Sequence, residues 1–170
     1  MNLDNYKITA VIPNYGFREK EIIRALNSII SQKLTPIEII IVDQNEKNNV
    51  ETIIKNFDNQ IKLKHIRTFG KYNGREGVSF ARNIGIENAT GDYIIFCDDD
   101  SWYPENYFYD IIIKIKKDNA DFITTKSIEN INHNRLMKNF SKKSLKLNKF
   151  NLHDNEIEFA CMFKVSALRD

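Results

Sequence analysis

Short apolar runs alternate with longer amphipathic segments along the first 125 residues of the chain. The runs at 8–12, 38–42 and 93–97 consist almost entirely of apolar residues, many of them Ile or Val. Strands that are apolar on both faces are typical of a parallel sheet covered by helices on each side. Runs at 61–66, 122–125 and 158–165 predict further strands.

The segments between these runs have helical periodicity. Apolar residues recur three or four positions apart in segments at 20–32, 50–57, 78–89 and 104–119. Pro13 is expected to end the first strand, Gly91 to terminate the third helix, and Pro104 to begin the fourth. Strand and helix alternating in this order predict an α/β fold with a doubly wound, mostly parallel sheet.

Composition narrows the class of protein. A chain of 170 residues with 42% hydrophobic residues has enough material for one domain, 1–170. A net charge of +2 argues against nucleic acid as the main partner. Cys97 and Cys161 lie among apolar residues and are expected to be buried, reduced thiols, which suits the cytoplasm.

Hydropathy argues against a transmembrane segment. No apolar stretch approaches the ~20 residues that span a bilayer, and the polar first residues have no signal-peptide pattern. Any membrane association is therefore expected to be peripheral, at the inner face.

Polar residues follow the predicted strands, where ligands bind in open α/β sheets. Asn14 follows the first strand, Asp43 the second, and Asp98, Asp99 and Asp100 the fourth. Adjacent carboxylates suit a hard cation such as Mg²⁺ or Mn²⁺, or form a solvated turn that caps the next helix. In an extended chain, Asp98 and Asp100 would point one way and Asp99 the other.

Four of these stretches have a recognisable order and spacing. Residues 11–15 (VIPNY), 39–43 (IIIVD), 81–85 (ARNIG) and 91–100 (GDYIIFCDDD) resemble the family 2 glycosyltransferases of the GT-A fold. The resemblance covers 8–126, the donor-binding half. It fades over 127–170, which is interpreted as the start of an incomplete acceptor half.

The resemblance implies roles for individual residues, beginning with an Asp-X-Asp motif at the acidic triplet. Asp43 would accept a hydrogen bond from the nucleotide base, or be a cap or a solvated loop acid instead. Arg82 would face the donor, or be a plain surface arginine. The implied donor-binding residues are Pro13, Tyr15, Asp43, Arg82, Asp98 (towards the ribose) and Asp99, and the implied metal ligand is Asp100.

One departure from the family concerns the base. The family commonly continues after the base-binding acid with Asp-Gly-Ser, whereas this chain has Gln44-Asn45-Glu46. Base selectivity therefore stays open, with a UDP-sugar as the default donor. Trp102 and Tyr103 would either stack on a sugar or pack the following helix. The histidines are isolated in sequence, and none is predicted to be a ligand (His65, His133 and His153).

The implied function is inverting transfer of a sugar from a nucleotide-diphosphate donor to an acceptor hydroxyl. The cofactor would be Mn²⁺ or Mg²⁺, and the acceptor a saccharide or a lipid-linked molecule in polysaccharide or glycoconjugate synthesis. The general base is expected beyond Asp170, since no late acid matches the family motif (Asp154, Glu156, Glu158 and Asp170). The alternative is a nucleotide-sugar-binding module, or a truncated fragment, without transfer activity of its own.

Two other classes are less compatible with the first loop. A nucleotidyltransferase usually has a Gly-rich, basic loop after its first strand, but residues 14–18 (NYGFR) contain one glycine and one basic residue. A receiver domain needs acids at this point, where the chain has Pro13 and Asn14.

Overall fold

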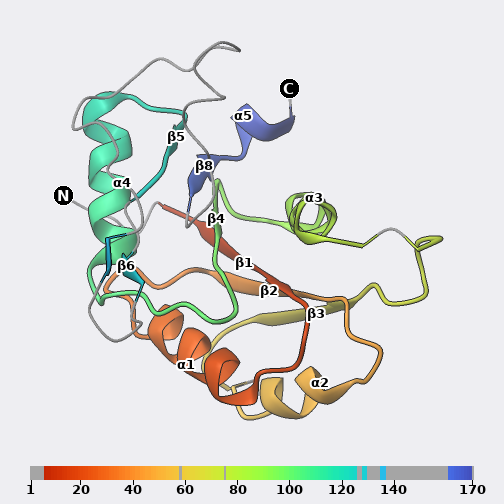
Figure 1. Cartoon of the computed structure of the whole chain (residues 1–170). Helices are drawn as coiled ribbons and strands as arrows, with labels where there is room; N and C mark the ends of the chain where they lie inside the picture. Colours follow the sequence, from red (N-terminus) through yellow and green to blue (C-terminus); the bar gives the residue numbers. More distant parts are fainter. Residues whose placement is uncertain are drawn as a thin grey trace.

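The computed structural model describes residues 6–57, 59–74, 76–125, 128–129, 135–136 and 161–169. Within these ranges, six strands form one sheet in the order β3-β2-β1-β4-β8-β5 (Figure 1). The strands are β1 (Ile8–Asn14), β2 (Glu38–Asp43), β3 (Leu63–Arg67), β4 (Tyr93–Phe96), β5 (Phe122–Ile123) and β8 (Met162–Lys164). The first four in this order are parallel, and β8 is antiparallel to both of its neighbours. The predicted mostly parallel α/β sheet is confirmed.

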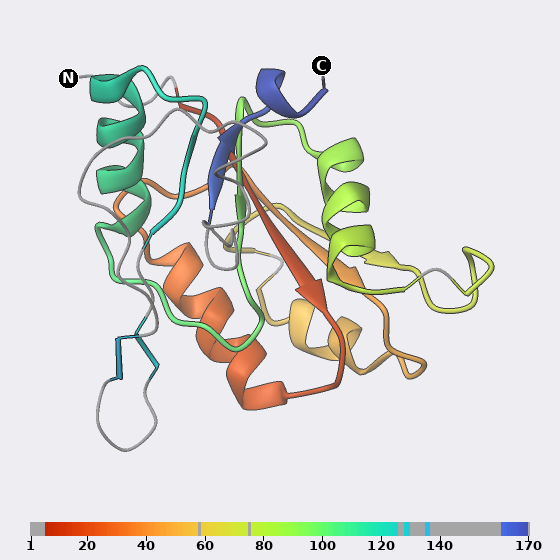
Figure 2. The ribbon, with the colours of Figure 1, turned by 45° about the horizontal axis from the view of Figure 1, so that its top comes forward.

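Helices cover both faces of the sheet, so the sheet is doubly wound (Figure 2). Helices α1 (Glu19–Ile30), α2 (Asn49–Ile54) and α4 (Tyr107–Asp118) pack on one face. Helices α3 (Val78–Asn88) and α5 (Ser166–Arg169) pack on the other. A separate pair, β6 (Ile128–Glu129) and β7 (Arg135–Leu136), is antiparallel.

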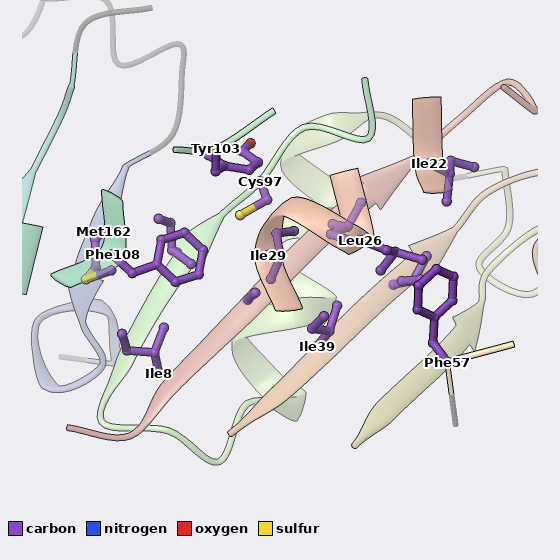
Figure 3. Close-up of a cluster of buried hydrophobic side chains, with 14 of the residues drawn as sticks. Ile8, Ile22, Leu26, Ile29, Ile39, Phe57, Cys97, Tyr103, Phe108 and Met162 are labelled. Atoms are coloured by element: carbon purple, nitrogen blue, oxygen red, sulfur yellow. The ribbon is translucent and has the colours of Figure 1, made fainter. Parts of the chain in front are cut away.

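The larger hydrophobic cluster shows how periodicity becomes packing. Ile22, Leu26 and Ile29 recur on one side of α1 and are at most 1% exposed. They face the sheet beside Ile39, and Phe108 of α4 fills the same layer (Figure 3). Each such side chain contributes about 1.5–3 kcal/mol through burial. The apolar stripe of α1 therefore fixes the orientation of the loop that precedes it.

Pro13 does not end the first strand, contrary to expectation, because β1 continues to Asn14. The hydrogen bond from Cys97 N to Val11 O shows that the backbone N–H and C=O groups of the odd-numbered residues of β1 point towards β4. Pairing between β1 and β4 ends at Val11. Proline has no backbone N–H, but at position 13 an N–H would find no partner on β4, so Pro13 breaks no hydrogen bond of the sheet. The extension brings Asn14 into register with Asp43.

Helix α4 begins at Tyr107 and not at Pro104 as expected. The side chain of Gln32 accounts for the delay. Its Nε2 donates to the carbonyl oxygen of Pro104 at 2.7 Å, and its Oε1 accepts from the N–H of Phe108 at 2.9 Å. Gln32 therefore pairs with the Phe108 N–H, which the helix leaves unpaired at its start, and shares the Pro104 carbonyl oxygen with the Tyr107 N–H.

Gly91 is not the terminator of α3. The helix ends at Asn88, and Ala89 is already extended. A Cβ at position 91 would lie 2.6 Å from the carbonyl oxygen of Lys7 and 2.8 Å from the N–H nitrogen of Thr9. Glycine is needed here because the chain passes close to the backbone of β1.

The structure also bears on the expectations for the cysteines, for a transmembrane segment and for the last strand. Cys97 and Cys161 are buried thiols, as predicted. No helix in the part of the chain that the structure describes is long and apolar enough to cross a membrane. The predicted strand at 158–165 is seen from Met162 to Lys164. Some of the residues discussed above lie outside the described ranges (His133, His153, Asp154, Glu156, Glu158 and Asp170).

Candidate functional site

The strand order places a topological switch point between β1 and β4. The chain moves from β1 outwards to β2 and β3, and α3 then carries it back to β4 on the other side of β1 (Figure 1). Loops diverge at such a point, and ligands bind at the carboxyl ends of the strands there. Asn14 ends β1, Asp43 ends β2, and the acidic triplet follows β4. The structure therefore brings these predicted residues to one edge of the sheet.

The three aspartates have different surroundings. The buried carboxylate of Asp99 accepts hydrogen bonds from Asn14 Nδ2 at 2.5 Å and from Arg18 at 2.9 Å. Asp100 is half-exposed and lies 3.1 Å from the other guanidinium nitrogen of Arg18. Asp98 faces Arg82 of α3 instead, at 3.9 Å. One arginine therefore holds Asp99 and Asp100, and another faces Asp98.

This grouping differs from the expected alternation, which paired Asp98 with Asp100. The strand ends at Phe96, and the chain then turns, with Ser101 N donating to Asp98 O at 3.3 Å. Side chains alternate only while the backbone is extended. Nor does the triplet cap the next helix, since Asn106 precedes α4.

Burial controls the charge of Asp98. Loss of solvent raises its pKa to about 6, although the positive charge of Arg82 opposes the shift, and Asp100 and Asp99 add to it. The backbone N–H of Asp98 donates to the hydroxyl of Tyr103 at 2.9 Å. The backbone of Asp98 is therefore held in place, and its partly buried carboxylate would gain from a cation or a hydrogen-bond donor.

Arg82 is the second charged group in this desolvated region. Its side chain is 23% exposed, which excludes a plain surface arginine. The guanidinium lies over the ring of Phe96 at 5.3 Å. Its Nε is buried, and no described residue accepts a hydrogen bond from it. An unsatisfied donor of this kind is suited to an anionic ligand.

Asp43 is completely buried, which excludes a solvated loop acid. One carboxylate oxygen accepts from the backbone N–H of Asn45 at 2.9 Å and from its side-chain amide at 2.7 Å. The other lies 2.9 Å from His65 Nε2. Burial raises the pKa of Asp43, but the hydrogen bonds from His65 and Asn45 outweigh it, so the pKa is lowered. These three donors occupy most of the roughly four acceptor sites of the carboxylate.

The aromatic residues near the strand ends divide into two groups. Tyr15 and Trp102 are 68% and 63% exposed, so their rings are available to a ligand. Tyr103 is buried in the core beside α4, which supports the packing interpretation for this residue. Pro13 is partly buried within β1.

Sequence reasoning gave no role to five residues of this network. Arg18 precedes α1, whereas His65 and Arg67 come from β3. Strand register pairs Asp43 with Arg67, so His65 reaches the carboxylate of Asp43 and Arg67 reaches the loop after β2. Only Asn14 had a signal, its place in a family-like stretch. The five residues are Asn14, Arg18, Asn45, His65 and Arg67.

A cation site can be tested against the donor set. Among the described residues, no group of three or more His, Cys, Asp or Glu side chains is arranged to hold a metal. Asp98 and Asp100 offer carboxylate oxygens, the ligands that Mg²⁺ and Mn²⁺ prefer. Mg²⁺ is usually bound by one or two carboxylates together with substrate phosphates. The residues therefore fit a metal shared with a phosphorylated ligand.

Comparison with known proteins identifies the family. A family model, Glycosyl transferase family 2, matches residues 9–170. Glycosyltransferase GlyA of Streptococcus pneumoniae is 33% identical over 115 residues, which cover 68% of this chain but 16% of GlyA.

Solved structures support the fold. The crystal structure of S. aureus TarS 1-349 matches with a TM-score of 0.77 and 22% identity, over 96% of this chain and 48% of that one. GalNAc-T7 with UDP, GalNAc and Mn²⁺ matches with a TM-score of 0.56 and 24% identity, over 69% of this chain and 22% of that one. The chain spans less than half the length of each of these proteins. With nearly its whole length matched by the family model, the chain belongs to glycosyl transferase family 2.

Proposed function

We propose that this domain binds a nucleoside diphosphate sugar at the switch point, and that the protein transfers the sugar to an acceptor hydroxyl with inversion. The observation that carries the proposal is the unsatisfied, buried Nε of Arg82 beside the desolvated carboxylate of Asp98. An anionic ligand with an associated cation satisfies both groups at once.

UDP is the proposed nucleotide. TarS, whose fold this chain shares, has been crystallised in complex with UDP and with UDP-GlcNAc. Tyr15 presents an exposed ring for the base, and Asp43 lies at the end of the neighbouring strand to accept its hydrogen bond. Pro13 is proposed to lie beside the base in the same loop, and Asp98 to lie towards the ribose.

The phosphates are proposed to lie between α3 and the acidic triplet. Arg82 would pair with the diphosphate, and Asp100 would hold Mn²⁺ or Mg²⁺ while Asp99 stays bonded to Asn14. A bound divalent cation supplies charge neutralisation for the departing diphosphate. The structural likeness to GalNAc-T7, which was solved with UDP, GalNAc and Mn²⁺, supports this choice of metal.

The remaining assignments rest on the sequence. The acceptor is proposed to be a saccharide or lipid-linked hydroxyl in polysaccharide or glycoconjugate synthesis. The general base is unassigned, and the expected compartment is the cytosol. A donor-binding module without transfer activity would use the same residues.

Calorimetry can test the proposal by measuring UDP binding in Mn²⁺ and in EDTA. We expect binding in Mn²⁺ to be tighter than in EDTA, and Asp100→Asn to remove most of that difference. The matched control is Asp110→Asn, which changes an exposed carboxylate on α4 and should leave binding unchanged. Failure of UDP, GDP and dTDP to bind in either condition would overturn the proposed function. Full metal dependence in Asp100→Asn would overturn the metal assignment alone.

A further inference from the structure

Asn45 lies where the sequence departs from the family pattern, in the loop between β2 and α2. Its side-chain amide nitrogen donates to Asp43 at 2.7 Å and to the side-chain oxygen of Asn14 at 2.5 Å. Its side-chain oxygen accepts from the backbone N–H of Gly16 at 2.7 Å. One side chain therefore joins the ends of β1 and β2 to the loop after Tyr15.

The hydrogen bonds continue from Asn45 to the acidic triplet, and each amide along the way donates to the next group. Asn14 Nδ2 donates to Asp99 at 2.5 Å, which leaves its oxygen to accept from Asn45. Ionised Asp43 and Asp99 can only accept, and the N–H of Gly16 can only donate, so both amide orientations are fixed. Asn45 and Asn14 thus form a two-amide bridge between the two carboxylates.

Burial makes this bridge difficult to replace with water. Asn14 and Asp43 are completely buried, and Asp99 is 6% exposed. Loss of the Asn45 amide would leave the Asn14 oxygen without the donor it now has and remove one donor from Asp43. Groups so deeply buried regain few hydrogen bonds from solvent.

We propose that Asn45 is a positioning residue that couples the base end of the donor site to its phosphate end. It fixes Asp43 directly, Asp99 through Asn14, and the Tyr15 loop through Gly16. This inference rests on the proposed function, since it assigns nucleotide binding to the same strand ends. Asn45 acts through residues that touch the ligand, so its effect depends on them.

The test compares UDP affinities in Mn²⁺ by calorimetry, with folding of each variant checked by thermal unfolding. Asn45→Ala should weaken binding about tenfold. Asn45→Asp has nearly the same shape but replaces the donating amide nitrogen with a second acceptor. Asn45→Asp should therefore weaken UDP binding at least as much as Asn45→Ala. If Asn45 were needed only for packing, Asn45→Asp would keep the affinity of the wild type. Asn48→Ala is the matched control, since the side chain of this exposed asparagine in the same loop bonds only to Glu51 among the described residues.

A double-mutant cycle with Asp43→Ala distinguishes positioning from independent contact. If Asn45 acts largely through Asp43, adding Asn45→Ala to Asp43→Ala should cost about threefold or less. Additive losses, or wild-type affinity in Asn45→Asp, would overturn the inference while leaving the proposed function intact. Absence of UDP, GDP and dTDP binding by the unmodified chain would overturn both together.

Discussion

At the scale of single residues, the three neighbouring aspartates meet different partners because different segments pack around them. Asp99 and Asp100 share Arg18, whereas Asp98 is partly buried and lies 3.9 Å from Arg82. Desolvation raises the pKa of Asp98 from 3.8 to about 6. In the metal-free protein, ionisation of Asp98 therefore opposes folding.

The sign of this effect gives a testable pH dependence. A raised pKa in the folded state means that the stabilising, protonated form is fully present below about pH 4 and lost as pH rises through 6. Asp98→Asn should therefore increase the free energy of unfolding by about 1–3 kcal/mol at pH 7.5 in EDTA. The gain should vanish at pH 4. Chemical denaturation at both pH values measures it, and destabilisation at both would show that the ion pair with Arg82 dominates.

At the scale of elements, Glu38 joins three segments at the opposite edge of the sheet. The buried carboxylate begins β2, and it accepts from the Thr9 hydroxyl at 2.9 Å and from the Thr90 N–H at 2.7 Å. Lys62 Nζ lies 2.9 Å away. Burial raises the pKa of Glu38, but Lys62 and the two threonines outweigh it and lower the pKa to about 2.

Glu38→Gln should consequently destabilise the protein by roughly 3 kcal/mol at pH 7. A lowered pKa gives stability that is present above about pH 4.5 and lost as pH falls towards 2. The difference between wild type and variant should therefore shrink over this window. Urea unfolding at several pH values provides the measurement, and a difference independent of pH would contradict the role of the charge.

A second prediction at this scale concerns the close packing of α3 on β1. A Cβ at Gly85 would lie 2.3 Å from a methyl group of Val11, so a larger residue must displace the helix. Gly85→Ala should cost about 1–3 kcal/mol through overpacking. Val11→Ala removes the two methyl groups, and the double variant should be less destabilised than the sum of the single variants. Additive losses would show that the contact is relieved elsewhere.

At the scale of the whole molecule, the sheet joins parts of the chain that the sequence analysis had divided. Strand β8 lies between β4 and β5, so the segment at 161–169 completes a sheet that begins within 8–126. Met162 is completely buried and packs in the same cluster as α1 and α4 (Figure 3). Residues from both predicted halves therefore share one core.

Met162→Ala tests this shared core. The substitution should cost about 2–5 kcal/mol, as expected for a buried large-to-small change. It should lower the midpoint of a single unfolding transition that also reports on α1. Lys164→Ala, on the same strand with an exposed partner at Asp121, should cost much less. A separate early transition for the late strand would show that it folds independently.

The sequence was most informative where structure depends on neighbouring residues. The apolar runs predicted the central strands within one or two residues, since burial on both faces leaves an unbroken apolar pattern over 39–42. The ends of the helices were predicted less accurately. Gln32 delays the start of α4 through contacts 72 and 76 residues away in the chain, which no local signal reveals.

By itself, then, the sequence determined the fold class, the family resemblance and the edge of the sheet where polar residues gather. The fold class follows from periodicity, the resemblance from four motifs in order and spacing, and the edge of the sheet from polar residues that come directly after strands. The tertiary structure alone decided how burial shifts the pKa of Asp98, which arginine each aspartate meets, and that Asn45 joins Asp43 to Asp99 through Asn14. Such contacts depend on strand register and on turns beyond the strand ends, where distant segments meet and sequence spacing carries no information about direction.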